Sequence, residues 1–492
     1  RDTAIAASAA HGYDAGIKPG TPKRLERNRS MSSIAGVELP DFGSESNPPQ
    51  ILSATYRSRM AAAVERMARA GLDVLAVYAD REHSATMAYL TGMDPRFEEA
   101  LLLIGKGGNA LLLVGNECEG YVPDEKPALT VELFQDFSLM GQPRGSSRPL
   151  RAILSDFGVG RDVRVGCVGW KCYDVALTGA PDRASDLPSY IVDVLRDLTG
   201  SAENVTNATD LFTNPANGLR VVGIEPEQIA AFEYASIQTS TSTLAAMRAL
   251  REGVREDELE RWLVTRGLPL SCHRMISFGR SSLRGLSSPS ANRAALGDVY
   301  TIGFGVAGAL TSRAGFIARG PADVSEGVRD HYARFAANYF DVVCAWYGAL
   351  RLGVTGGEVF AAVERVRDDS LYRLAVNPGH TLHLDEWVHS PFAAGSTVPL
   401  NSGMALQMDI IPVSKGPFCY ANAEDGVVLA DASLRAALAR DYPACWRRIQ
   451  ARRSFMDQTL GIPLDEAVLP LSNMPAYLPP YVMSPERVFV NR

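Results

Sequence analysis

The decapeptide ALREGVREDE at residues 249–258 is echoed by ALRLGVTGGE at residues 349–358. The two copies share Ala, Leu, Arg, Gly, Val and Glu at equivalent positions. Each copy follows one long helical pattern and opens another, and a glycine-led apolar run comes later in each half. A helix, turn, helix and strand unit that occurs twice predicts a pseudo-symmetric α+β domain whose sheet is shared between the halves. Ligands commonly bind in the crevice between such halves.

The chain around this duplication is long enough for a second domain. Its 492 residues exceed what one hydrophobic core usually supports. A helical pattern from Tyr56 leads into the apolar run DVLAVYA, and two further apolar runs flank Lys106 to Asn109 in the order of a β-hairpin. We therefore predict an α/β N-terminal domain followed by the duplicated α+β domain. The predicted ranges are an N-terminal extension at 1–50, the α/β domain at 51–215, the duplicated domain at 216–450 and a C-terminal extension at 451–492.

Composition argues against several classes of protein. The net charge of −7 and the lack of a basic stripe argue against nucleic acid as a partner. No apolar run reaches the roughly 18 residues of a membrane-spanning helix. We interpret the residues ahead of Met31 as a leader or cloning remnant. They lack the apolar core of a secretory signal. We therefore predict a cytoplasmic protein without a membrane partner. The seven scattered cysteines, without CxxC spacing, are interpreted as reduced core thiols.

The stretch NPGHTLHLDEWVH, residues 377–389, holds three of the seven histidines and two carboxylates. Such a density is typical of a metal site, because imidazole and carboxylate groups are common metal ligands. Other landmarks follow a fixed order: YLTGMDPRFEEALLLIG at 89–105, GD at 297–298, GMALQMDIIP at 403–412 and ED at 424–425. Together with the duplication, they resemble the creatinase, prolidase and aminopeptidase P superfamily, of M24 type, over residues 55–450. The resemblance implies the pita-bread fold for the C-terminal domain, with its internal pseudo-twofold duplication.

Metallopeptidases of this superfamily bind two divalent metals through two aspartates, a histidine and two glutamates. Carried over by position, the histidine falls on His380, the first glutamate on Asp409 and the last glutamate on Glu424. Two cations about 3.5–4 Å apart require several anionic ligands to offset their charge and to polarise a bridging water. The three matching residues are therefore the candidate site.

The two metal-binding aspartates are missing. The first falls on Gly303, and the second falls near Ser312 and Arg313, in a stretch, 299–322, that contains no Asp or Glu at all. We therefore predict a divergent member of the superfamily that holds no metal and no other cofactor. The alternative is a mononuclear site that combines a carboxylate with two of the three histidines of the 377–389 stretch. Its candidate ligands are His380, His383, His389, Asp409 and Glu424.

Creatinase is the precedent in this superfamily for chemistry without metal, with a histidine that shuttles protons. The equivalent position here is Leu286 or Ser287, and no histidine occurs between Arg274 and Asp330. His273 lies close by but precedes the glycine turn, and we interpret it as a core or edge residue. The chain therefore differs from creatinase itself.

The catalytic residues predicted instead are His380, Asp409 and Glu424, which could carry out acid–base chemistry or bind a cation. Asp385 and Glu386 belong to a loop that is longer than the usual pattern, and we interpret them as solvated acids. His389 and His383 are predicted to bind the substrate because they lie in the 377–389 stretch, and Arg313 because it lies beside the lost aspartates. Arg96 and Phe97 are predicted to do so because they correspond to the N-terminal region that, in relatives, reaches the neighbouring subunit's site.

Two classes of function follow. The first is a metal-independent, creatinase-like hydrolase or lyase that cleaves a C–N or related bond in a small polar, cationic or zwitterionic metabolite. The second is a binding protein that kept the fold and lost turnover. A metallopeptidase for Xaa-Pro bonds ranks third, because two metal ligands are missing. Relatives form dimers, so the resemblance also implies a homodimer.

Overall fold

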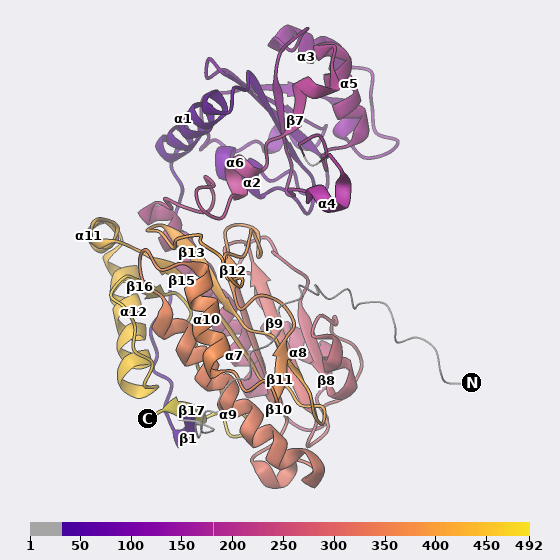
Figure 1. Cartoon of the computed structure of the whole chain (residues 1–492). Coiled ribbons are helices and arrows are strands. Elements are labelled where there is room, and N and C mark those ends of the chain that lie inside the picture. The colour runs from indigo at the N-terminus through magenta and orange to yellow at the C-terminus, as the bar shows by residue number, and fades with distance from the viewer. Residues whose placement is uncertain (1–31, 181) are drawn as a thin grey trace.

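The computed structural model describes residues 32–180 and 182–492, which form two bodies stacked on one another (Figure 1). Residues 1–31, the first part of the predicted N-terminal extension, lie outside the described residues. The upper body in Figure 1 contains a mixed sheet, and the lower body contains a larger antiparallel sheet with long helices along it. This content agrees with the predicted fold class, while the exact domain boundaries stay a prediction.

The N-terminal body is built on a six-stranded sheet in the order β5-β4-β3-β2-β6-β7. Its three central strands are buried at every position, which is why they read as continuous apolar runs in the sequence. The predicted hairpin forms between β3 and β4, with Gly108 at φ 84° in its turn. The strands are β2 (Val74–Ala79), β3 (Ala100–Gly105), β4 (Ala110–Val114), β5 (Thr130–Leu133), β6 (Val165–Val168) and β7 (Val205–Asn207).

Helices accompany this sheet and bury apolar residues against it. Met60 and Met67 of the first helix belong to one core cluster, and Ile153 and Ile191 of two later helices belong to another that shares the sheet. The helices are α1 (Ser53–Arg69), α2 (Ala85–Thr91), α3 (Leu150–Phe157), α4 (Val175–Thr178), α5 (Ser189–Thr199) and α6 (Asp210–Thr213).

The C-terminal body is built on a seven-stranded antiparallel sheet. The order along it is β12-β13-β15-β10-β9-β8, and β16 pairs with β15 outside that path. A separate two-stranded sheet joins β11 and β14. The strands are β8 (Met275–Phe278), β9 (Val299–Val306), β10 (Ala309–Phe316), β11 (Tyr372–Leu374), β12 (His380–Thr381), β13 (Met404–Asp409), β14 (Pro412–Ser414), β15 (Asn422–Leu429) and β16 (Val468–Pro470).

The repeated decapeptide marks the same turn in both halves of this body. It closes α7 (Pro226–Ala249) in the first half and α9 (Glu326–Ala349) in the second. Both copies then turn through a glycine at positive φ, Gly253 at 86° and Gly353 at 79°. In both, the backbone amide that begins the next helix donates to the glutamate three residues on, which caps the helix. The predicted duplication is therefore present in the backbone.

The two halves differ in the helix that follows the turn. α10 (Gly356–Val366) has eleven residues, whereas α8 (Glu256–Leu259) has four and continues only as a short 3-10 turn. The helix that the first copy was predicted to open is therefore much shorter than the one that the second copy opens. Arg266 and Gly267 adopt positive φ just beyond it, and Pro269 follows, so that the chain leaves the helical path and runs extended. This extended segment lines the cleft described below.

The two chain extensions meet at the far end of the C-terminal body. β1 (Ser32–Gly36) pairs antiparallel with β17 (Arg487–Asn491), and both strands lie against α9 (Figure 1). Two helices, α11 (Ala432–Asp441) and α12 (Pro443–Ser454), lead into the C-terminal extension, whose residues are mostly buried. The described parts of both extensions therefore pack on the core of this body.

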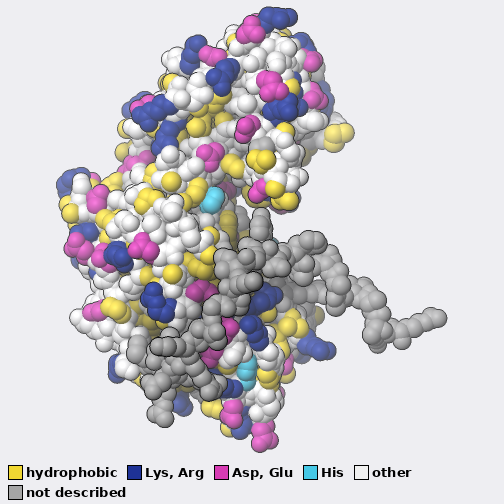
Figure 2. Space-filling model, in the orientation of Figure 1, with side chains coloured by type: hydrophobic (Ala, Val, Ile, Leu, Met, Phe, Trp, Pro, Cys, Tyr) yellow, Lys and Arg dark blue, Asp and Glu magenta, His cyan; other side chains and the backbone are white. Residues whose placement is uncertain are grey.

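Two surface properties complete the description. Among the described residues, no helix is both long and apolar enough to cross a lipid bilayer. On the face seen in Figure 2, Lys and Arg side chains are interspersed with Asp and Glu, and the surface is indented between the two bodies. All seven cysteines are free thiols, and five of them are buried.

Candidate active site

The sheet of the C-terminal body brings the three predicted catalytic residues together. Asp409 at the end of β13 pairs with Glu424 on β15, and His380 on β12 pairs two residues earlier on β13. One ligand atom from each of the three side chains lies within 4.8 Å of the others. All three side chains are buried, with residue exposures of 0% for His380, 4% for Asp409 and 7% for Glu424. The three residues are called the trio below.

The turn before His380 requires a glycine. Gly379 has φ 101°, and a β-carbon there would lie 2.8 Å from the carbonyl oxygen of Gln407 and 3.1 Å from the Trp346 ring. The Trp346 indole nitrogen donates a 2.7 Å hydrogen bond to the carbonyl oxygen of Pro378. The close approach of the turn to β13 and α9 therefore fixes the position of the imidazole.

Glu386 belongs to the site, and its interpretation as a solvated loop acid is wrong. Its Oε1 lies 3.1 Å from Nε2 of His380, closer than the 3.9 Å from that nitrogen to Asp409 Oδ2. The neighbouring Trp387 stacks on the imidazole with ring centroids 4.1 Å apart and planes 20° apart. The other loop acid, Asp385, lies 2.5 Å from Nη1 of the buried Arg220. The loop thus turns both acids inward.

The hydrogen bonds of His380 define where its proton can sit. Nδ1 donates to the carbonyl oxygen of Thr381 at 3.2 Å, because a carbonyl can only accept. Nε2 is then an acceptor in the neutral ring and a donor in the imidazolium. Nε2 lies 3.1 Å from Oε1 of Glu386 but makes no hydrogen bond among the described residues, so that this nitrogen is the one free to take up or give a proton.

Burial and crowding shift the pKa values of the trio upward. Burial raises the pKa of Asp409 to about 7, with Glu386 adding to the rise and His380 opposing it. Burial, followed by the charges of Asp409 and Glu386, raises the pKa of Glu424 well above its usual range. For His380, burial disfavours the cation, but Glu386 and Asp409 outweigh it, so that the imidazole pKa is raised. Within the described residues, neither Asp409 nor Glu424 forms an ion pair with a lysine or an arginine.

The two metals of the superfamily's peptidases do not fit this set of residues. In the sheet register, the residues next to Glu424 in the same row are Ser312 and Gly303, which offer no carboxylate. A β-carbon at Gly303 would lie 2.8 Å from the terminal methyl of Met275, so that this methionine already fills the place. The trio has the spacing to hold one ion, but a second ion would have no carboxylate ligands on β9 or β10.

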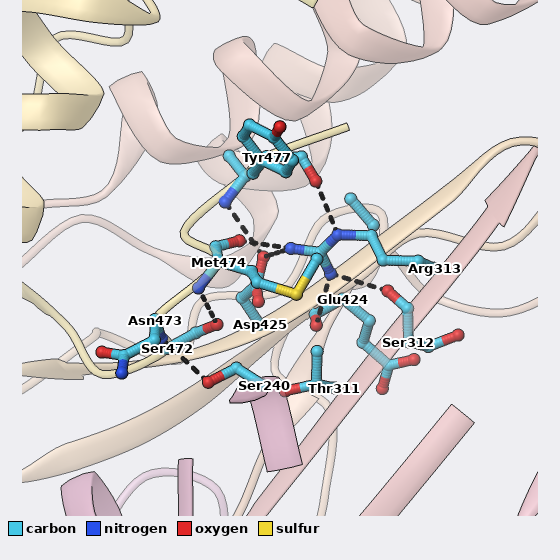
Figure 3. A network of polar contacts seen from close by, with 12 residues as sticks. Ser240, Thr311, Ser312, Arg313, Glu424, Asp425, Ser472, Asn473, Met474 and Tyr477 are labelled. Carbon is cyan, nitrogen blue, oxygen red and sulfur yellow. Dashed lines mark hydrogen bonds and ion pairs between the residues drawn. The ribbon is translucent and has the colours of Figure 1, made fainter. Parts of the chain in front are cut away.

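Arg313 has a different role from the predicted one. Its Nη2 lies 2.7 Å from Oδ2 of Asp425 and also donates to the carbonyl oxygen of Met474, and its Nε donates to the carbonyl oxygen of Tyr477 at 2.7 Å. Nη1 donates to the carbonyl oxygens of Ser312 and Glu424 (Figure 3). With its donors engaged and the residue fully buried, Arg313 is not available to a substrate.

The other predicted substrate-binding residues are scattered. His383 is fully buried and lies edge-on to Tyr89 and Phe232, at the junction of the two bodies. His389 is exposed, and its backbone pairs with Thr381. Arg96, at φ 60°, reaches the hydroxyl group of Tyr121 and lines the cleft between the bodies, whereas Phe97 is 52% exposed and does not line it. None of them contacts the trio.

A cleft of about 900 Å³ lies between the two bodies and leads to this site. Its walls come from α1, α2 and nearby loops above, and from α7 and the extended 268–273 segment below. Glu386 and Trp387 line it, whereas the trio lies behind them. Nothing in the sequence alone marked these two residues, although an aromatic residue next to an acid in a histidine-rich loop is a usable signal. Other residues that line the cleft include Phe232, Cys272, Leu384 and Asp385.

Solved structures with the same architecture include three peptidases. The prolidase from Pyrococcus horikoshii OT3 superposes with a TM-score of 0.58 at 15% identity, over 76% of this chain and 95% of that chain. The dipeptidase PepE from Mycobacterium ulcerans gives 0.56 at 19% identity, over 77% and 95%. A histidine-to-alanine variant of Escherichia coli aminopeptidase P gives 0.51 at 17% identity, over 80% and 99%.

Sequence comparison adds nothing to these likenesses, because no protein-family model and no curated protein matches the chain. The structural neighbours cover most of this chain and nearly all of their own length, so that the likeness extends over both bodies. Their identities are too low to carry over activity. The chain therefore has the two-body architecture and the pita-bread fold of the creatinase, prolidase and aminopeptidase P superfamily.

Proposed function

We propose that this protein is a hydrolase or lyase that cleaves a C–N or related bond in a small polar, cationic or zwitterionic metabolite, without a metal ion. The observation that carries the proposal is the contact of His380 with Glu386, beside two buried carboxyl groups whose pKa values are raised. Groups that gain and lose protons near neutral pH are what acid–base catalysis requires. Their place behind a cleft is that of an active site.

The geometry suggests a division of labour. His380 removes a proton from the attacking water or from the substrate through Nε2, because Nδ1 is engaged with Thr381. Asp409, with a pKa of about 7, or Glu424, with a higher pKa, holds a proton that it donates to the leaving nitrogen. The two roles fall to different groups because their surroundings hold the proton with different strength.

Metal independence is part of the proposal, and it rests on the missing carboxylates beside Glu424 and on Met275 in their place. Elemental analysis of the purified protein is expected to find less than one equivalent of Mn, Zn, Fe or Co, and chelators should leave turnover unchanged. One full equivalent that is lost together with turnover would support the mononuclear alternative at the trio. Two equivalents would contradict the proposal outright.

A binding protein without turnover is the second candidate. The observation in its favour is that Glu386 contacts His380, Trp387 stacks on its ring, and both lie between it and the cleft. The third candidate, an Xaa-Pro metallopeptidase, is favoured only by the names of the structural neighbours. It requires the two carboxylates that the chain lacks.

Metabolite profiling separates the first two candidates. Purified protein is incubated with a pool of small polar metabolites, in parallel with the variant His380→Asn, which keeps a polar side chain of similar size. We expect a compound to be consumed by the wild-type protein only. If no compound changes with the wild-type protein, or if the variant consumes it equally, catalysis by His380 is rejected.

The assembly and the location of the protein are also proposed. Following the superfamily resemblance, we propose a homodimer, which light scattering coupled to size-exclusion chromatography would test. We place the protein in the cytoplasm, where its seven free thiols would stay reduced. A stable monomer at micromolar concentration would contradict the first of these statements.

A further inference from the structure

An acid and an indole, Glu386 and Trp387, line the cleft at the place where it approaches His380, which is called its inner end below. Of the four polar groups of the site, Glu386 alone lines the cleft, and its side chain is 25% exposed. Trp387 lines it as well and is 39% exposed. Because His380 covers one face of the indole at 4.1 Å, the exposed part of the ring is what the cleft meets. A ligand that fills the cleft therefore contacts these two side chains before any other part of the site.

Three carboxyl groups lie together at this wall, since each of Asp409 and Glu424 feels the charge of Glu386. The raised pKa values of Asp409 and Glu424 favour their protonated forms, so that Glu386 is the carboxylate that the cleft meets. The group that lies beside these carboxyl groups and can become a cation is the His380 imidazole. Among the described residues, no arginine or lysine forms an ion pair with any of the three carboxylates. The Glu386 carboxylate therefore lines the cleft without an arginine or lysine paired to it, which leaves it open to a ligand cation.

The neighbouring acid shows that this imbalance is local. Asp385 precedes Glu386 in the chain and is paired with the buried Arg220 at 2.5 Å. That pair anchors the loop to the chain segment that joins the two bodies, so that Glu386 is held in place without receiving a cation of its own. Within the part of the chain that the structure describes, its ion-pair partner is the imidazole of His380.

We infer that the inner end of the cleft binds an organic cation, an alkylated ammonium or a guanidinium group, between the Glu386 carboxylate and the indole of Trp387. Aromatic faces attract such weakly hydrated cations, and an indole does so most strongly. A carboxylate at the side of the ring adds a charge-assisted contact. The inference rests on the proposed function and deepens it, because it names the part of the substrate that the site recognises and the two residues that recognise it.

Isothermal titration calorimetry of the full chain tests the inference with pairs of probes that differ only in charge. Choline is compared with its neutral isostere 3,3-dimethylbutan-1-ol, and methylguanidinium with methylurea. We expect at least one cation to bind with a Kd of about 1 mM or tighter, as expected of a fragment of this size. Its neutral isostere should bind at least about tenfold more weakly. The better of the two cations identifies the ligand class.

Variants assign the binding to the two residues. Glu386→Gln and Trp387→Ala should each weaken cation binding by about tenfold, and Trp387→Phe should restore part of it. The matched controls are Glu82→Gln, an acid that lines the cleft elsewhere, and Trp262→Ala, an indole that is 40% exposed but outside the cleft. Both controls should bind like the wild type. Thermal unfolding of each variant verifies that the fold is intact.

Three results would overturn the inference: no cation binds in this range, a cation and its isostere bind equally, or the controls weaken binding as much as the test variants. The outcome is separable from that of metabolite profiling. Cation binding without consumption of any metabolite would support the inference and reject catalysis. If a metabolite is consumed in a His380-dependent way but no cation binds, catalysis is supported and the inference is rejected.

Discussion

Glu424 and Asp425 are adjacent on β15, both are buried, and their surroundings are opposite. Asp425 meets the guanidinium of Arg313 at 2.7 Å and accepts a hydrogen bond from the amide of Ala476 at 3.0 Å. Glu424 feels the charges of Asp409 and Glu386, and its carboxyl group accepts a hydrogen bond from the side chain of Gln407 at 3.3 Å. The alternation of a strand places the two carboxylates on opposite faces of one sheet.

This difference separates a structural carboxylate from a functional one. Asp425 has its charge neutralised and its position fixed by the C-terminal extension (Figure 3). Glu424 is kept short of partners, as is typical of groups that must change protonation state or bind a ligand. Arg313 also donates to the backbone carbonyl of Glu424, so that the structural network holds the functional residue in place from behind.

The largest effect on stability is expected from removing the ion pair between Arg313 and Asp425. Arg313→Met leaves Asp425 buried without its cation, and the free energy of unfolding should fall by about 3–5 kcal/mol. Glu424→Gln, the matched change on the functional face, replaces a carboxyl group whose raised pKa favours the protonated, neutral form by a neutral amide of the same size. It should change stability by less than about 1 kcal/mol. Chemical denaturation of both variants measures the contrast, and equal losses would refute it.

The pH dependence of stability sharpens the same contrast. The folded protein holds the proton of Asp409 up to about pH 7, whereas the unfolded chain releases it near pH 3.8. The folded state therefore loses stability as pH rises through this window, and the raised pKa of His380 acts in the same direction above pH 6.5. Relative to wild type, Asp409→Asn should gain about 1–3 kcal/mol between pH 5 and pH 8.

The control for this experiment is Asp323→Asn, which removes an acid whose pKa is lowered by its pair with Arg319. That carboxylate is charged in both the folded and the unfolded state above pH 5, so that its contribution does not vary between pH 5 and pH 8. Denaturant titrations at several pH values measure both variants. A wild-type curve parallel to that of Asp409→Asn would show that Asp409 ionises normally.

A third change attempts to restore an acid to the functional face. Gly303→Asp introduces a side chain where the methyl of Met275 now lies, 2.8 Å from the new β-carbon. Because Met275 must move within a packed sheet, we expect a loss of about 1–3 kcal/mol. Adding Met275→Ala should recover part of that loss. If Gly303→Asp alone is as stable as wild type, Met275 does not exclude an acid from this place.

The smallest effect is expected at His383. Among the described residues, no group hydrogen-bonds either of its ring nitrogens, and burial lowers its pKa well below the usual value. His383→Phe should therefore change the unfolding free energy by less than about 1 kcal/mol, because no hydrogen bond is lost. Cation binding in the cleft should also persist. A loss above about 2 kcal/mol, or loss of binding, would give His383 a polar role after all.

The sequence predicted much of the fold and part of the site. The repeated decapeptide identified the turn after each long helix, since Gly253 and Gly353 are needed there and the valines that follow are buried. The order of landmarks also indicated His380, Asp409 and Glu424, and the structure places them together. A helix was predicted after the first copy, but its early end at Leu259 was not, because Arg266, Gly267 and Pro269 outweigh the helical pattern before them.

Predictions that depended on which way a side chain points were less accurate. Arg313 follows Ser312 directly, and this one-residue difference sends its guanidinium to Asp425 and the C-terminal extension instead of to the site. Glu386 was set aside because loop acids are usually solvated. Its contact with His380 depends on a loop path that no local pattern encodes.

The sequence by itself determined the duplicated framework, the trio of candidate residues and the lack of acids at residues 299–322, because these depend on residue type and order along the chain. Only the tertiary structure decided that Glu386 and Trp387 stand between the cleft and the trio, and that Arg313 belongs to a structural network. The physical reason is that the neutralisation of a charge depends on distances in the folded structure and not on neighbours along the chain. Whether a carboxylate is paired depends on which distant segment the fold brings within about 3–4 Å of it.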